Sequence, residues 1–71
     1  MSANLLPWQQ RVVEERAALS DRLQKLDCFL NDRFLRESVT ERDLKLLQEQ
    51  SSCMHKYHAI LVLRIARFEA Q

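Results

Sequence analysis

The stretch that decides the fold spans residues 40–68 and reads TERDLKLLQEQSSCMHKYHAILVLRIARF. Thr40 is a good helix N-cap residue, and Asp43 three positions later gives a weak capping box. An inner stripe then recurs at steps that alternate three and four, and it comprises Leu44, Leu47, Ser51, Met54, His58, Leu61, Ile65 and Phe68. This heptad spacing predicts a long helix over 41–69 that packs along its length against another helix.

The preceding half of the chain supplies the partner helix. Pro7 suits the first helical position, because its missing N–H would be unpaired there anyway. A second stripe follows at steps of three and four, broken once by Arg16, and it comprises Trp8, Val12, Leu19, Leu23, Leu26 and Leu30. We therefore expect a tail over 1–6, a helix over 7–31 and a connection over 32–40. Phe34 and Leu35 are expected to plug the closed end.

Composition supports this all-α interpretation. The 71 residues contain no glycine and one proline, whereas tight β-turns usually require glycine. Good helix formers such as Leu, Arg, Glu, Gln and Ala dominate instead. The sequence thus predicts one domain over 1–71, an antiparallel two-helix hairpin. A core of this size is marginal, so we expect a homo-oligomer, a helical bundle.

A second apolar face lies beside the inner stripe of the 41–69 helix. One neighbouring helix cannot cover a helix on every side, so another subunit is expected to bury this face. The alternative is that the first helix and the tail wrap it alone. The expected interface residues are Met54, Tyr57, Ile60, Leu61 and Ile65.

Charge and cysteine content narrow the function classes. The formal charge is +1, with 11 basic and 10 acidic residues, which disfavours a nucleic-acid polymer as partner. The apolar run over 59–63 is too short for a membrane span. No signal peptide is expected, so the cytoplasm is the default location, with Cys28 and Cys53 reduced and unpaired.

Metal and catalytic sites are not expected. Cys53 and His55 would point to different sides of a helix, and the pair His55 and His58 is too few for a structural zinc site. Cys53 is more simply a small buried apolar residue. Ser51 and His58 lie seven residues apart with no evident oxyanion hole, so they are better explained as polar residues of the packing seam.

The open end of the hairpin is the candidate binding site. Antiparallel packing brings the start of the first helix beside the end of the second, where unpaired N–H groups favour anions. Arginines add bidentate donors, and aromatic rings stack on bases. The candidate residues are Trp8, Gln10, Arg11, Tyr57, Arg64 and Arg67. The alternative is that these residues are structural. Trp8 would then fill the core, Arg64 and Arg67 would complement the dipole of the second helix, and Tyr57 would belong to a subunit interface.

Two segments of the chain form a recognisable pattern. The first is QQRVVEE over 9–15, followed by Leu23, Lys25, Leu26 and Phe29. The second comprises Leu46, Leu47, Gln50, Met54, Tyr57, Leu61, Arg64, Ile65 and Phe68. Together they resemble a family of short uncharacterised helical proteins of tailed phages and prophages, related to a crAss-like phage protein. Arg16, Cys28 and residues 32–38 depart from the pattern.

The resemblance implies a small phage-type accessory protein in the cytoplasm of the bacterial host cell. By analogy with other small helical phage proteins, we expect counter-defence by sequestration of a cyclic nucleotide or ADP-ribose-type signalling ligand. No catalysis and no cofactor is expected. The alternative is a protein-interaction module that inhibits or adapts a host protein through its apolar face.

Overall fold

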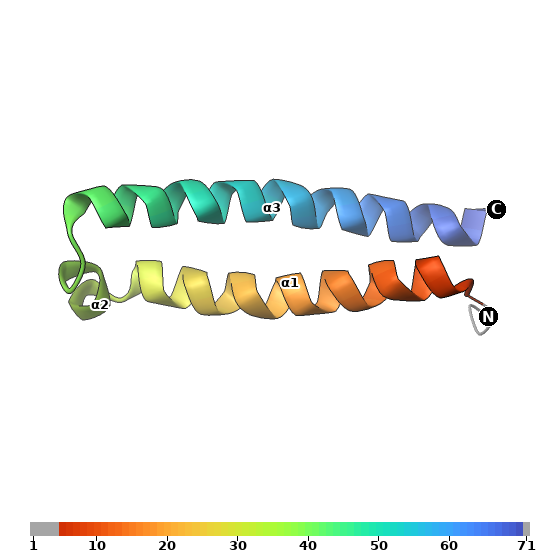
Figure 1. The fold of residues 1–71 in the computed structure, drawn as a ribbon, viewed down its shortest axis with the longest axis horizontal. Helices are drawn as coiled ribbons and strands as arrows, with labels where there is room; N and C mark the ends of the chain where they lie inside the picture. The colour runs from red at the N-terminus through yellow and green to blue at the C-terminus, as the bar shows by residue number, and fades with distance from the viewer. Residues whose placement is uncertain (1–4, 71) are drawn as a thin grey trace.

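The computed structural model describes residues 5–70, so most of the expected 1–6 tail lies outside the described residues. The elements are α1 (Pro7–Asn31), α2 (Arg33–Glu37) and α3 (Glu41–Ala70) (Figure 1). The predicted all-α class is confirmed, and no strand occurs in the described part of the chain. The connection expected over 32–40 contains the short helix α2.

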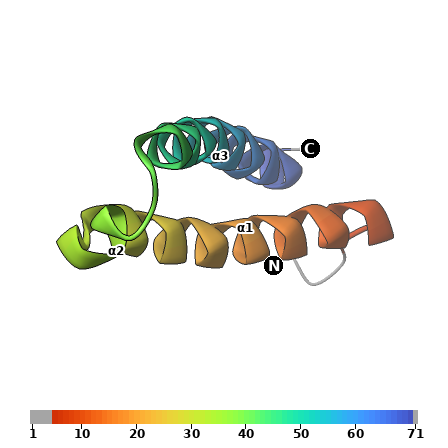
Figure 2. The same cartoon turned by 60° about the vertical axis from the view of Figure 1, so that its left-hand side comes forward.

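The two long helices lie side by side and run in opposite directions. Figures 1 and 2 both place the start of α1 near the end of α3, and the molecule measures 47 × 16 × 16 Å. Between the helices lies a small core of Val12, Leu19, Leu23 and Leu61, against which Met54, Ile65 and Phe68 pack. The inner stripe of α3 therefore faces α1.

Local signals set where the long helices begin. Pro7 occupies the first turn of α1, and the Leu6 N–H donates to the Gln9 Oε1 atom at 2.9 Å. Leu6 carries no polar side chain, so only this half of a capping box exists. At the start of α3, the Thr40 Oγ1 atom accepts from the Asp43 N–H at 3.2 Å. This bond supplies a partner for an otherwise unpaired N–H.

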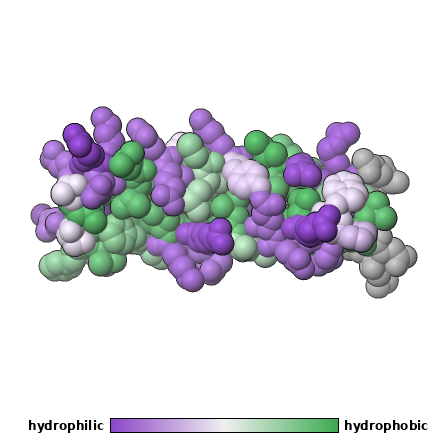
Figure 3. Space-filling model, in the orientation of Figure 1, coloured by the Kyte–Doolittle hydropathy of each residue, from purple (hydrophilic) through white to green (hydrophobic). Residues whose placement is uncertain are grey.

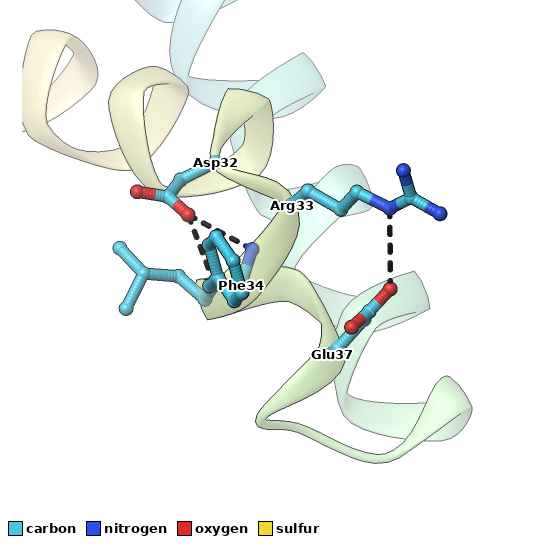
Figure 4. Close-up of polar contacts among 5 residues, drawn as sticks. Asp32, Arg33, Phe34 and Glu37 are labelled. Carbon is cyan, nitrogen blue, oxygen red and sulfur yellow. Dashed lines mark hydrogen bonds and ion pairs between the residues drawn. The ribbon is translucent and has the colours of Figure 1, made fainter.

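The short helix α2 departs from expectation in where it places its apolar side chains. Asp32 ends α1 and caps α2, because its Oδ1 atom accepts from the N–H groups of Phe34 at 2.9 Å and Leu35 at 3.1 Å (Figure 4). The capped turn leaves Phe34 85% and Leu35 43% exposed. The prediction that they plug the closed end was therefore wrong.

Large apolar side chains remain exposed on α3. Figure 3 shows hydrophobic groups at the surface among hydrophilic ones on the face in view. Leu46, Tyr57, Ile60, Val62 and Leu63 are each more than two-fifths exposed, and Cys53 is also exposed rather than buried. The helices of the described chain include none that is long and apolar enough to cross a membrane.

The expected subunit interface has to be revised in part. Leu61 has no exposed surface, so it belongs to the core of its own chain and is unavailable to a second copy. Met54 and Ile65 also pack against that core. Tyr57 and Ile60 keep 41% and 53% of their surface exposed. The inner stripe was expected to pack against the first helix, and spacing alone could not show how completely that helix covers Met54, Leu61 and Ile65.

His58 gives a test of the helix seam. Its Nε2 atom is buried without a hydrogen-bond partner in the described structure, which costs free energy. Replacing His58 with Leu should raise the free energy of unfolding by about 1–2 kcal/mol, because the unpaired group is removed and apolar area is added. Urea denaturation measures this change. Gln48→Leu, at an exposed position, is the control, and a destabilised His58→Leu variant would contradict the prediction.

Candidate functional site

A hollow of about 170 Å³ lies at the open end of the hairpin, between the first turn of α1 and the last turns of α3. Trp8, Arg64, Arg67 and Phe68 line it. The Trp8 and Phe68 rings meet edge to face, with centroids 5.3 Å apart and planes at 86°. Such a pair of aromatic rings contributes about 0.5–1.5 kcal/mol beyond the burial of its area. It holds the two rings together in the hollow that Arg64 and Arg67 also line.

The electrostatics of this hollow favour an anion. Two of its four lining residues carry guanidinium groups, and none carries a carboxylate. Leu6 provides no side-chain cap for α1, so among the described residues the N–H groups of Trp8 and Gln9 have no side-chain acceptor. A helix N-terminus also carries a partial positive charge. Three sources of positive potential therefore converge on one aromatic surface.

The structure brings together only part of the candidate set from the sequence. Trp8, Arg64 and Arg67 line the open-end hollow, and Phe68 joins them. Gln10 and Arg11 are exposed on α1 but are not among the lining residues. Tyr57 lies seven residues before Arg64, about 10 Å along the helix axis, and is not among them either.

Two larger hollows lie at the closed end of the hairpin and are less suited to anions. One, of about 450 Å³, is lined by residues that include Arg33, Arg36, Glu37 and Glu41. Arg33 already pairs with Glu37, with 3.4 Å between the Arg33 Nε and Glu37 Oε1 atoms (Figure 4). The other hollow, of about 530 Å³, is lined mainly by apolar groups with Asp21, Lys25 and Asp32 at its edge. Carboxylates in both would repel an anion.

A polar cluster halfway along the hairpin was missed by the sequence analysis. Asp27 on α1 accepts a hydrogen bond from the Ser51 Oγ atom at 2.9 Å, and its Oδ2 atom lies 2.9 Å from the His55 Nε2 atom. Asp27 directly follows Leu26 of the apolar stripe, so it sits at the edge of the helix seam. Finding this cluster required the rotational setting of α1 against α3, which spacing alone does not give.

This cluster is not arranged for nucleophilic catalysis. The Ser51 hydroxyl donates to the Asp27 carboxylate rather than to a histidine, and a carboxylate whose pKa is held below its ordinary value is a weak base for activating a hydroxyl. Nor does the described part of the chain hold any group of three or more His, Cys, Asp or Glu placed to bind a metal ion. Cys28 and Cys53 are free thiols at the surface. The cluster instead ties α1 to α3.

The protonation state of Asp27 provides a test of that tie. The hydrogen bond from Ser51, with a smaller contribution from His55, holds the pKa of Asp27 below its ordinary value of 3.8. The carboxylate therefore favours the folded state fully above that value, and this contribution is lost as pH falls through the lowered pKa. The difference in Tm between the wild type and Asp27→Asn should thus be largest above about pH 5 and should shrink towards pH 3.

Thermal unfolding followed by circular dichroism measures this difference. Asp21→Asn is the matched control, because Asp21 pairs only with the exposed Lys25 on its own helix. A difference between wild type and Asp27→Asn that stays constant from pH 6 to about pH 3 would show that the carboxylate of Asp27 does not support the fold.

Comparison with known proteins places the chain in a family. The family model for Sequestin matches residues 6–67, which include all of α1, most of α3, and Trp8, Arg64 and Arg67 of the open end but not Phe68. No curated protein and no solved structure matches the chain. Because the family model covers most of the chain, the chain belongs to the Sequestin family.

Proposed function

We propose that this chain is a small phage-type accessory protein that sequesters an anionic, nucleotide-like ligand at the open end of its hairpin without changing it chemically. The observation that carries the proposal is the hollow in which Arg64 and Arg67 flank the Trp8 and Phe68 rings. The family name, Sequestin, points in the same direction. Counter-defence in the cytoplasm of a bacterial host is the biological role we infer.

The lining residues suit the two parts of a nucleotide. A guanidinium forms bidentate hydrogen bonds with phosphate oxygens, which Arg64 and Arg67 can offer together. An aromatic face or edge accommodates a base by stacking or apolar contact, which Trp8 can provide because it is 44% exposed. Cyclic nucleotides and ADP-ribose-type molecules combine both parts. Such a ligand therefore matches the chemistry of this end.

Storage rather than turnover is the role that the residues support. Hydrolysis or transfer would require a general base beside a nucleophile or a metal ion. None of the four lining residues is a nucleophile or a base at neutral pH. The hollow of about 170 Å³ is smaller than the roughly 300–1,000 Å³ of typical ligand sites. One copy therefore covers only part of a nucleotide, and a neighbouring subunit would have to enclose the rest.

A second candidate function is a protein-interaction module that inhibits or adapts a host protein. The observation that favours it is the exposed apolar surface of α3, where Ile60 and Leu63 are 53% and 65% exposed. Apolar patches of this kind occur at protein interfaces. This candidate predicts no nucleotide affinity at the open end, so one binding experiment separates the two.

Calorimetry against cyclic dinucleotides, cyclic trinucleotides and cyclic ADP-ribose isomers tests the proposal. We expect one of these ligands to bind with a micromolar or tighter Kd. Arg64→Ala and Arg67→Ala should each weaken that binding by about 1.5–3 kcal/mol, because each removes charge-assisted hydrogen bonds to phosphate. Recovery of the ligand unchanged by chromatography checks the absence of turnover.

Arg22→Ala is the matched control, because Arg22 is an exposed arginine of α1 that does not line the open-end hollow. Its affinity should equal that of the wild type. Millimolar or weaker binding of every ligand, or equal binding by both open-end arginine variants and wild type, would favour the interaction module instead.

A further inference from the structure

A second heptad stripe runs along α3 directly beside the inner stripe. Each of its members precedes a member of the inner stripe by one residue, so the two stripes lie about 100° apart around the helix. We call it the outer stripe, and it comprises Leu46, Gln50, Cys53, Tyr57, Ile60, Arg64 and Arg67. The inner stripe faces α1, whereas Leu46 and Ile60 are 58% and 53% exposed.

Two adjacent heptad stripes are what a helix needs to contact two neighbours in a bundle. The steps of the outer stripe alternate four and three without a break, which is the repeat of a helix that packs along another helix. The small core explains why a second neighbour is needed, since only four apolar residues of the described chain are buried, and of these only Leu61 completely. A helix is therefore the occupant that fits this face.

The second neighbour is more plausibly another α3 than another α1. The positions of α1 that flank its own buried stripe are mainly polar or charged: Arg11, Glu15, Arg22 and Lys25 on one flank, and Gln9, Ser20, Gln24 and Asp27 on the other. An apolar stripe laid on either flank would desolvate these groups without pairing them. Packing α3 on α3 buries two apolar stripes at once, as an isologous interface does.

The charges along the outer stripe select the direction of packing. The stripe begins at Asp43, one step before Leu46, and ends in Arg64 and Arg67. Parallel packing would stack arginine on arginine, whereas antiparallel packing moves both arginines towards the Asp43 end of the other copy. On the flank, Glu49 and Lys56 lie four and three residues from Cys53, so antiparallel copies bring them together. Arg42 lies at the same end as Asp43, so it reduces the electrostatic preference for antiparallel packing but does not reverse it.

We propose that two copies of this chain form an antiparallel four-helix bundle by packing α3 on α3 through the outer stripe, with the two-fold axis near Cys53. The open end of each copy then lies beside the N-terminal part of the other copy's α3, which adds a wall to the hollow between Trp8 and Arg64. The bundle does not rest on the proposed ligand, since it is argued from the spacing and charges of α3 alone. Arg64 and Arg67 nevertheless belong both to the outer stripe and to the lining of the open-end hollow.

Thiol cross-linking tests the direction of packing. Leu46 and Ile60 each lie seven residues from Cys53, on opposite sides, so antiparallel packing places Leu46 of one copy beside Ile60 of the other. Leu46→Cys and Ile60→Cys are made separately in a Cys28→Ser, Cys53→Ser background and carry tags of different mass. A short bis-maleimide should join them into a mixed dimer. Neither variant alone should be joined efficiently, because like positions then lie roughly 20 Å apart.

Each other outcome overturns a stated part of the inference. Efficient joining of each variant with itself, without the mixed product, would mean parallel packing. No joined product in any mixture, together with a monomer mass for the wild type in light scattering at micromolar concentration, would remove the bundle altogether. Binding of nucleotide by such a monomer would leave the open-end site standing.

Light scattering of two variants separates the outer stripe from general destabilisation. Ile60→Asp should halve the mass of the wild-type dimer, because it places unpaired charge in the packed interface. Gln48→Asp, which lies on a different side of the exposed surface of α3, should keep the dimer mass. Circular dichroism checks that both variants remain helical, and a dimer that survives Ile60→Asp would contradict the assigned interface.

Discussion

The packing of α1 against α3 is the interaction on which everything else in this structure depends. Within the described residues neither helix has a second covering layer, and the buried apolar side chains are four, Val12, Leu19, Leu23 and Leu61. Helices in proteins gain most of their stability from packing of an apolar face rather than from propensity. A chain of 71 residues with so small a core has little stability to spare. This scarcity makes the apolar surface left on α3 significant rather than incidental.

The open-end site is a product of that packing and is absent from any single segment. Trp8 lies at the start of one helix, and Arg64, Arg67 and Phe68 lie at the end of the other. Only antiparallel contact puts an uncapped helix N-terminus, two guanidinium groups and two rings in one place. A chain with a formal charge of +1 can therefore present a locally cationic surface. The overall balance of charge and the local preference for an anion are compatible.

The sequence predicted the helical class and part of the candidate site, for physical reasons that also explain what it missed. Pro7 and Thr40 act locally, and the structure shows both at helix starts. Periodicity placed Leu61 in the inner stripe but could not show how fully one helix would cover it, so Leu61 was also assigned to the subunit interface although it is fully buried. Phe34 is exposed because Asp32 caps the short helix α2 and so sets the direction of this turn. The composition of the segment does not reveal that capping bond. The chain turns without glycine because no described residue adopts a positive φ.

Heptad stripes alone leave the two helices free to slide, and the Asp27 cluster removes that freedom. A slip by one heptad would move α3 about 10 Å along α1 while keeping apolar residues against apolar residues. It would also separate Asp27 from Ser51 and His55, whose bonds at 2.9 Å exist in one register only. Polar groups at a helix seam commonly specify register at some cost in stability. Here the selected register is the one that sets Trp8 against Phe68, and with them the arginines of the open end. The cluster thereby favours the register in which Trp8, Arg64, Arg67 and Phe68 come together at the open end.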